Sequence, residues 1–220
     1  EALAALAMLL TTLSRLGHDL QLWCTFEYGL AEVGDDVAST SSIMPQKKNP
    51  SALEHVKGKA SHAIGALAAT LTAMKGTAFT HSREIAGESA HPFEEAAGQA
   101  EAALQIMTAV LRSLRFRTGA ARERAGENFS TMTELADVLV RSEGLSFRQA
   151  HQVVATVVRL ALDRGLRSAT EVKAGLVNEA AREVLGRPTR LTDDGGAAAL
   201  DPARNVAGKT VTGGPAPAEV

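Results

Sequence analysis

The chain has 220 residues and a formal net charge of −2; 45% of its residues are hydrophobic, but only 4% are aromatic. This near-neutral balance gives no reason to expect nucleic acid or an anionic membrane as a partner, and charges and glycines interrupt every apolar run before it reaches transmembrane length. Cys24 is the only cysteine, which excludes an internal disulfide and favours the reducing environment of the cytoplasm.

The first segment predicts a long helix. Leucines recur at helical spacing from Leu3 to Leu20, Gly17 takes one position of the same stripe, and the pattern extends into residues 18–24. The chain starts at Glu1, inside this pattern, without an initiator methionine or the basic leader of a signal peptide. We therefore expect a fragment of a longer protein, or one half of a split enzyme that lacks its N-terminal segment or chain.

A second long helix is expected after a loop over residues 34–50. Asn49 and Pro50 predict the N-cap and the first position of this helix. Its apolar face recurs at steps of three or four residues from Leu53 to Met74, and Gly76 ends it.

The pattern predicts a third helix over residues 85–114. Pro92 lies inside it and indicates either a kink or a late helix start. The side chains expected on its buried face are Leu104, Met107, Leu111 and Leu114.

Beyond Gly119 three shorter helices are expected, and from Gly186 onward Gly, Pro and Thr indicate a mostly irregular tail. A capping-box pattern opens each helix: Thr131 with Glu134, Ser146 with Gln149, and Ser168 with Glu171. The middle helix has an apolar stripe of Phe147, Ala150, Val154, Val157 and Ala161. The sequence thus predicts an all-α protein: a long-helix bundle over residues 1–117, then a small helical C-terminal domain with an irregular tail over residues 118–220.

The segment 41–50, SSIMPQKKNP, concentrates two hydroxyls, two ammonium groups and a side-chain amide between two apolar helical patterns. A polar surface loop between helices is the simplest interpretation, but the order of residues resembles the signature loop of the fumarase and argininosuccinate lyase superfamily, G-S-S-x-M-P-x-K-x-N-P. Thr40 stands in place of the leading Gly. Three further segments resemble argininosuccinate lyase: LSRLGHDL at residues 13–20, TELAD at 133–137 and FRQAH at 147–151.

The resemblance covers nearly the whole chain, aligned to roughly the C-terminal half of a family member. It implies a fumarase-type helical bundle and a cytoplasmic, cofactor-free lyase that uses no metal. The implied reaction is β-elimination of a substituted succinate, which releases fumarate and usually an amine. The family's catalytic His lies in the N-terminal half, which is absent from this chain.

Carried over residue by residue, the resemblance implies specific roles. Ser41 is the base that removes the β-proton, Lys47 stabilises the negative charge that develops on the neighbouring carboxylate, and Asn49 holds a substrate carboxylate. Glu54 matches the glutamate that orients the acid His. It is also placed where an ordinary first-turn acid would be favoured by the helix dipole.

Ser42 and Met44 are further candidates for substrate contact within the same loop. Ser42 has an alternative role as a local cap. Lys48, which follows Lys47, is interpreted as a solvated neighbour and not as a ligand.

The sequence departs from argininosuccinate lyase after the second helix. Where the family carries a Tyr, a Gln and a Lys that hold the amino-acid side of the substrate, this chain has His81, Ala86 and Ser89. His81 and Arg83 are candidate substrate contacts in this segment. The dicarboxylate substrate is therefore expected to differ from argininosuccinate. Nitrosuccinate or another succinyl adduct is an alternative substrate.

The superfamily resemblance further implies a homotetramer whose active sites are shared between subunits. Two other hypotheses stay open. The chain could be a catalytically inactive helical scaffold, as some lens crystallins of this superfamily are, or an enzyme for adenylosuccinate or a cyclic lactone.

Overall fold

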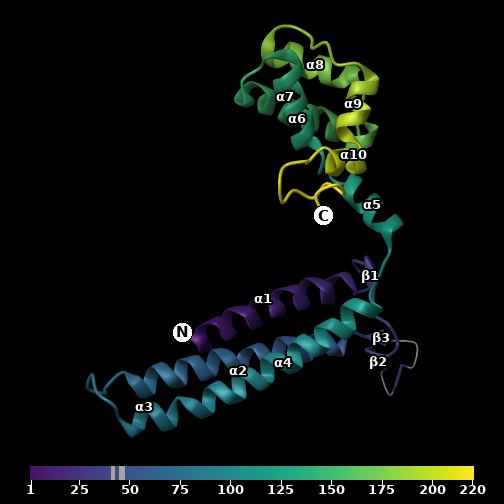
Figure 1. Cartoon of the computed structure of the whole chain (residues 1–220). Coiled ribbons are helices and arrows are strands. Elements are labelled where there is room, and N and C mark those ends of the chain that lie inside the picture. The colour runs from purple at the N-terminus through teal and green to yellow at the C-terminus, as the bar shows by residue number, and fades with distance from the viewer. Residues whose placement is uncertain (41–42, 45–47) are drawn as a thin grey trace. The chain divides into compact units, whose positions relative to one another are not determined.

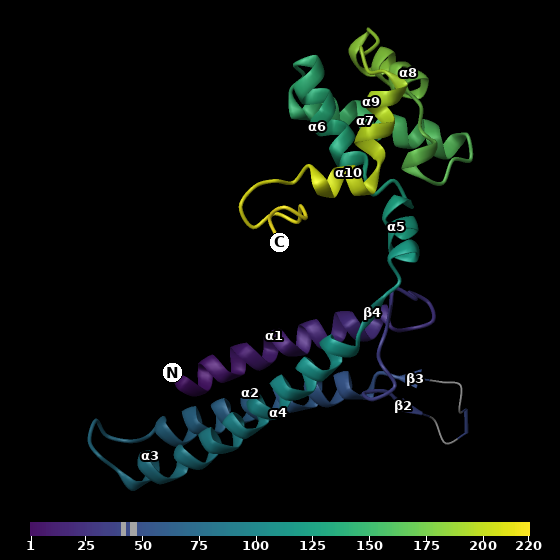
Figure 2. The same cartoon turned by 45° about the vertical axis from the view of Figure 1, so that its right-hand side comes forward.

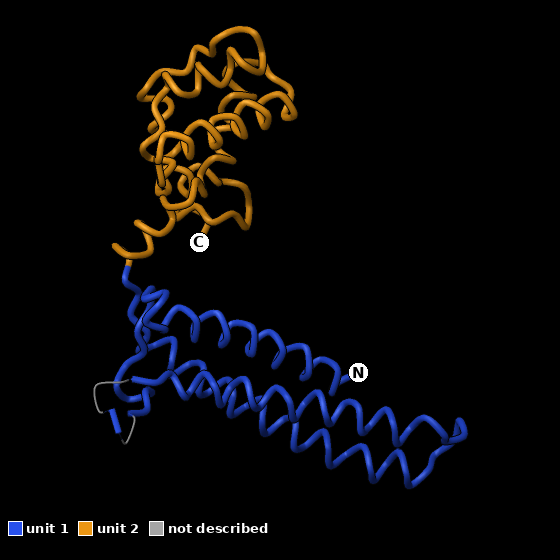
Figure 3. The backbone as a smooth tube through the Cα atoms, turned by 180° about the vertical axis from the view of Figure 1, so that it is seen from behind, with its two compact units in different colours: residues 1–117 blue, residues 118–220 orange. Residues whose placement is uncertain are grey.

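The computed structural model describes residues 1–40, 43–44 and 48–220. The chain forms two compact units, Glu1–Arg117 and Thr118–Val220 (Figure 3). Helices make up most of both units, which confirms the all-α prediction.

Three long helices lie side by side in the first unit: α1 (Ala2–Trp23), α2 (Ser51–Met74) and α4 (Ala90–Ser113) (Figures 1 and 2). Leu10, Leu53 and Val110 are fully buried between them. Small side chains fill the rest of the seam and let the helix backbones approach closely. They are Ala7, Gly17, Ala60, Ala63, Ala96, Ala100 and Ala103.

Short elements join these helices. β1 (Ala31–Glu32) pairs antiparallel with β4 (Arg115–Phe116), and β2 (Ser39–Thr40) pairs antiparallel with β3 (Lys48–Asn49). Both ladders lie at the same end of the bundle (Figure 1). The connection between α2 and α4, which contains the short helix α3 (Arg83–Glu88), lies at the opposite end.

Two predicted helix starts differ from the observed ones. Helix α2 begins at Ser51 with Pro50 as its N-cap residue, because Asn49 is extended and pairs with Ser39 in the β2–β3 ladder. The predicted third helix is divided at Ser89 into α3 and α4, so the late start is correct. Pro92 lies in the first turn of α4, where its missing N–H breaks no intrahelical bond.

The predicted buried faces are correct along α1 and the first half of α2, but wrong near the end of α2 and correct only in part along α4. Leu104 and Leu111 are 43% and 49% exposed, because alanines and Val110 face the seam of α4 instead. Leu71, near the end of the predicted α2 face, is 60% exposed. The first unit therefore carries more large apolar side chains than its own core buries.

The second unit contains six α-helices among its residues: α5 (Thr118–Gly126), α6 (Met132–Glu143), α7 (Phe147–Asp163), α8 (Ala174–Leu185), α9 (Asp193–Leu200) and α10 (Pro202–Ala207). A single 3-10 turn spans Ala169–Glu171. The core is built from Leu135, Leu139, Val153, Val157, Val177 and Leu200, which are all fully buried. Phe147 is an exception to its predicted stripe, being 61% exposed at the start of α7.

Of the three predicted capping boxes, that of Ser146 and Gln149 opens α7 as expected. Ser168 and Glu171 form a box that opens only the 3-10 turn, and α8 starts later, at Ala174. The box predicted at Thr131 is wrong, since its hydroxyl donates to the carbonyl oxygen of Leu200 at 3.1 Å.

The irregular tail is also a wrong prediction in part, because α9 and α10 lie within it. Thr192 caps α9 by accepting from the Gly195 N–H at 3.1 Å. Asp201 caps α10 by accepting from the Arg204 N–H at 2.9 Å, and Pro202 occupies the first helical position. These local caps offset the poor helix propensity of the glycines in α9.

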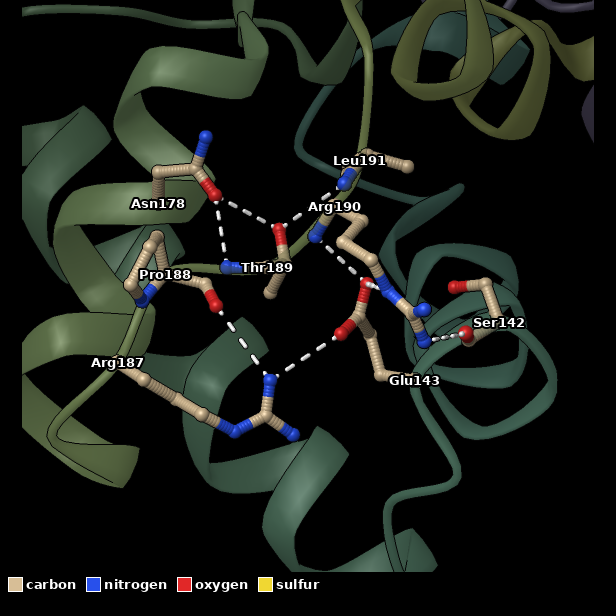
Figure 4. A network of polar contacts seen from close by, with 8 residues as sticks. All are labelled: Ser142, Glu143, Asn178, Arg187, Pro188, Thr189, Arg190 and Leu191. Carbon is tan, nitrogen blue, oxygen red and sulfur yellow. Dashed lines mark hydrogen bonds and ion pairs between the residues drawn. The ribbon is translucent and has the colours of Figure 1, made fainter.

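Glu143 holds the segment after α8 against the end of α6 (Figure 4). Its side chain is 1% exposed, and one oxygen accepts from the Arg190 backbone N–H at 2.7 Å, while the other accepts from the Arg187 guanidinium at 3.3 Å. Next to it, the amide oxygen of Asn178 accepts from both the N–H and the hydroxyl of Thr189, at 2.9 and 2.8 Å. A buried carboxylate is tolerated here because these donors replace its water.

We predict that Glu143→Gln lowers the free energy of unfolding of the second unit by about 1–3 kcal/mol, the usual cost of leaving a buried hydrogen-bonding group without its partner. Urea denaturation followed by circular dichroism measures the change. Trp23, the sole tryptophan, lies in the first unit, so its fluorescence transition should move much less. The exposed Glu123 supplies the matched control, Glu123→Gln, and equal behaviour of the two variants would contradict the prediction.

Glu134 ties the C-terminal tail to α6. Its carboxylate is paired with Lys209 at 2.5 Å and with Arg141 at 2.6 Å. Burial alone raises the pKa of Glu134, but the hydrogen bonds from Lys209 and Arg141 together hold that pKa below its ordinary value of 4.5.

A lowered folded-state pKa stabilises the protein above the unfolded pKa, and this contribution is lost as the pH falls through the folded value. We therefore predict that Glu134→Gln costs about 1.5 kcal/mol at pH 7. The difference from the wild type should narrow below pH 4.5. Denaturation curves at pH 7, 5 and 4 measure it. If the difference in the free energy of unfolding between the wild type and Glu134→Gln stayed constant or widened on acidification, the effect would be due to packing and not to charge.

Candidate functional site

The site predicted from the sequence falls at the strand end of the first unit. Ser41, Ser42 and Lys47 lie outside the described residues. Met44 is 44% exposed. Asn49 lies in β3 and is half-buried, and Glu54 follows in the first turn of α2.

A pocket of about 780 Å³ brings Asn49 and Glu54 together. It is lined by the end of α1, the turn that follows it, β1, and the junction of β3 with α2. Its polar lining residues are Gln21, Thr25, Glu27, Glu32, Lys48, Asn49, Glu54 and Arg117. The mixture of two amides, carboxylates and cations within one concave surface suits a small, charged ligand better than an apolar one.

Gln21 of α1 holds Glu54 in place. The Gln21 amide nitrogen donates to the Glu54 carboxylate at 3.1 Å, and its amide oxygen accepts from the Lys57 ammonium at 2.8 Å. This chain of contacts spans α1 and the first two turns of α2. Glu54 is thus more than an unattached first-turn acid, since a residue from another helix orients it.

Lys48, interpreted from the sequence as a solvated neighbour, has a side chain that is 42% exposed and that makes two ion pairs. Its ammonium lies 3.0 Å from Glu32 and 2.5 Å from Asp35. The second oxygen of Glu32 accepts from the Arg117 guanidinium at 3.1 Å. Hydrogen bonds to Asp35 and Glu32 raise the pKa of Lys48, and hydrogen bonds from Lys48 and then Arg117 lower the pKa of Glu32.

Cys24 also lines the pocket, but it is a poor candidate for a nucleophile. It is partly buried against the core of the bundle, and this burial raises the pKa of its thiol. A thiol that resists ionisation reacts slowly. No group of three His, Cys, Asp or Glu side chains in the described part of the chain is placed to hold a metal ion.

His81 and Arg83 are not brought to this pocket. Both are exposed at the far end of the bundle, beyond the last turn of α2 (Figure 1). Helix α2 has 24 residues, which corresponds to a length of about 36 Å. A single copy of this unit therefore cannot present Asn49 and His81 to one small molecule.

Sequence reasoning missed Glu32, Asp35 and Gln21. Each of them contacts a residue between 13 and 33 positions away, as the pairs Asp35–Lys48 and Gln21–Glu54 show. No helical or strand periodicity encodes such a pairing. The one available signal is the alternation around Glu32, whose neighbours Ala31 and Val33 are apolar and buried, as expected for a strand with one inward face.

Two family models match parts of this chain. The family model described as "Argininosuccinate lyase C-terminal" matches residues 129–207, and the model described as "Lyase" matches residues 1–65. No helix of the described residues is long and apolar enough to cross a membrane.

Three relatives illustrate the similarity. Argininosuccinate lyase 1 of Shouchella clausii is 44% identical over the whole chain, which covers 44% of that protein. Argininosuccinate lyase of Methanosphaera stadtmanae is 38% identical, and the chain covers 47% of it. The solved structure of an EDDS lyase variant with bound fumarate has a TM-score of 0.87 and 39% identity, over 99% of this chain and 43% of that one.

The chain thus spans less than half the length of the relatives it matches. Its fold, its two family matches and its sequence identity point to one group. The chain belongs to the fumarase/aspartase superfamily, over a region that corresponds to the C-terminal part of its argininosuccinate lyases.

Proposed function

We propose that the chain supplies the signature loop of a lyase that releases fumarate from an N-substituted succinate by β-elimination. The observation that carries this proposal is the pocket at the strand end of the bundle. There, Asn49, which belongs to the SSIMPQKKNP segment, and the oriented Glu54, which follows that segment in the chain, share one concave surface. The similarity to an EDDS lyase variant solved with fumarate supports the dicarboxylate product.

The chemistry explains why these residue types are needed. A proton must leave the carbon beside a carboxylate, and a second negative charge then develops on that carboxylate. In the proposed mechanism Ser41 removes the proton, Lys47 stabilises the added charge, and Asn49 holds a carboxylate of the substrate. The electron pair left on that carbon forms the double bond of fumarate as the C–N bond breaks, and the leaving amine takes a proton from the acid His that the family carries in its N-terminal half. A serine hydroxyl is a weak base by itself, so nearby cationic groups are required to activate it.

The structure supports Lys47 over Lys48 as the stabilising cation. Lys48 already faces two carboxylates, Glu32 and Asp35, which neutralise its charge. A paired ammonium offers less to a developing dianion than one aimed at the substrate. Lys47 has the family's motif position and is the residue we assign to that role.

The leaving group is proposed to differ from that of argininosuccinate. The family's Tyr, Gln and Lys, which hold the amino-acid side of the substrate, are His81, Ala86 and Ser89 in this chain. Each lost polar contact of this kind weakens recognition by ~1–3 kcal/mol when it leaves a buried group unpaired. An amine other than arginine, with His81 and Arg83 as contacts, is the better fit.

We predict that the protein, as its gene encodes it, releases fumarate from a substituted succinate and that Ser41→Ala lowers this rate at least ~100-fold, the range for loss of a positioned base. Absorbance of fumarate near 240 nm follows the reaction, with argininosuccinate as the first substrate. Fumarate incubated with varied amines or with nitrite tests the reverse reaction for other leaving groups.

Ser130→Ala is a matched control, because that hydroxyl lies in the second unit and donates to the Ala125 carbonyl. Release of fumarate that survives Ser41→Ala would contradict the assigned base. If no substrate released fumarate and neither amines nor nitrite added to fumarate, the inactive scaffold would become the better interpretation.

We also propose that the complete site is assembled from several copies of the chain in a homotetramer. The distance along α2 separates Asn49 from His81 within one copy, whereas an antiparallel second copy would bring the two helix ends together. Exposed apolar side chains along the long helices support such packing, since large apolar patches mark contact surfaces. They are Met8, Leu9, Leu16, Ile64, Leu71, Met74, Phe93, Leu104 and Leu111.

Light scattering should therefore give a mass near four chains. We predict that Leu71→Asp, which places a charge on the 60% exposed Leu71 of α2, shifts this mass toward smaller species. Leu162→Asp is the control, because Leu162 of α7 is similarly exposed, at 58%, in the second unit. A monomeric wild type that releases fumarate would exclude the shared site.

A further inference from the structure

Glu32 is held on a rigid platform at the end of the bundle. Its strand β1 pairs with β4, where Glu32 lies opposite Arg115, and the adjacent Arg117 N–H donates to the Leu30 carbonyl at 2.9 Å. The flanking side chains Ala31 and Val33 are 4% and 3% exposed, so the strand is fixed by its inward face. The Glu32 carboxylate therefore projects from a backbone whose position the bundle determines.

The strand that carries Asn49 lacks comparable support of its own. β3 has two residues and pairs only with the two residues of β2, Ser39 and Thr40, of which both are exposed. A two-stranded ladder of this length is not stable in isolation. Among the described residues, the ion pairs of Lys48 with Glu32 and Asp35 join β3 to β1 and to the turn that follows Gly34.

The two partners of Lys48 differ in how well they can hold it. The Asp35 side chain is 83% exposed, in the turn that follows Gly34. The Glu32 side chain is 41% exposed, lies on β1, and is steadied on its other oxygen by Arg117 at 3.1 Å. Glu32 is thus the anchor, and Asp35 adds to it.

Along the chain, Asn49 lies between Lys48, which contacts the Glu32 anchor, and the start of α2. Its preceding neighbour Lys48 is tied to β1, and its following neighbour Pro50 is the N-cap of α2. Fixing both neighbours restrains the backbone of Asn49, which lines the same pocket as Glu54. The sequence also sets Lys47 directly before Lys48, and Ser41 directly after Thr40, so the same two strands lead into the signature residues.

We propose that Glu32 is a positioning residue of the lyase site, which acts through the Lys48 ammonium to fix β3 and the substrate-binding Asn49. This inference rests on the proposed function. It assigns no proton transfer to Glu32. The Glu32 carboxylate is needed for the geometry of the site. Removing its charge should misplace Asn49 without changing the groups that transfer protons.

The test uses the protein as its gene encodes it, with the substrate that gives fumarate. Glu32→Gln should lower kcat/KM by about ten- to a hundredfold, the range for a misplaced binding group, with KM rising because Asn49 holds a carboxylate. The shape of the pH profile should stay unchanged, because hydrogen bonds from Lys48 and Arg117 lower the pKa of Glu32 and keep it ionised near neutral pH. If Glu32→Gln removed the acidic limb of the pH profile of kcat/KM, Glu32 would be a proton-transfer group and the proposal would be overturned.

A double-mutant cycle shows whether Glu32 acts through Lys48. Lys48→Gln should reproduce the loss, Lys48→Arg should keep most of the activity, and the double variant Glu32→Gln/Lys48→Gln should be no worse than Lys48→Gln alone. Additive losses would mean that the two residues act separately. Glu183→Gln is the matched control, because Glu183 forms a comparable exposed pair with Arg159 at 2.8 Å in the second unit.

Peptide-level hydrogen exchange provides a second readout that needs no substrate. In Glu32→Gln the backbone amides of residues 39–40 and 48–49 should exchange faster than in the wild type, and those of the β1–β4 ladder should not. Unchanged exchange in β2 and β3 would overturn the inference even if the enzyme's substrate were never found. If Ser41→Ala abolishes fumarate release while Glu32→Gln does not affect it, the positioning role fails and the proposed function stands.

Discussion

The close packing of α1, α2 and α4 is the constraint on which the rest of the molecule depends. Small side chains at the seam, such as Gly17 and Ala103, allow the backbones to approach, and the large residues Leu10, Leu53 and Val110 fill the remaining space. Because these helices are long, the packing also sets their two ends far apart, and the two ends carry different polar groups. The strand end holds the pocket, and the opposite end holds the segment with His81 and Arg83 (Figure 1).

This arrangement divides the charged groups into two kinds. Some stabilise the fold: Glu143 accepts a hydrogen bond from the backbone of the segment after α8, and Glu134 forms an ion pair with Lys209 of the tail. Others surround the pocket, where Lys48 is already matched by two carboxylates and Glu54 is oriented by Gln21. The same physical rule applies to both kinds, since a carboxylate is fixed in place when its donors come from another element.

Much of the fold was predictable because helical periodicity is a local signal. The stripe from Leu3 to Leu20 predicted α1, and the box of Ser146 and Gln149 predicted the start of α7. The errors arose where a distant contact overrides a local preference. Asn49 is a good N-cap residue by type, yet it pairs with Ser39 in a ladder, and Thr131 donates to Leu200 instead of capping its own helix.

The site was predicted in the same uneven way. The signature residues could be recognised from their order, and two of the predicted site residues, Asn49 and Glu54, line the same pocket. Glu32 and Gln21 could not be found, because the pairs they form cross from one element to another, and a single sequence carries no record of them. The exposure of Leu104 and Leu111 had the same cause, since which face of a long helix is buried depends on its neighbours.

The length of α2 makes this helix a spacer between two chemically different ends. One inserted or deleted residue would turn one end relative to the other by about 100° as well as shifting it by about 1.5 Å. A change of seven residues, close to two whole turns, would nearly restore the rotation while displacing the ends by about 10 Å. Substitutions along the exposed face of α2 are therefore a far milder way for such a protein to evolve than any change in its number of residues.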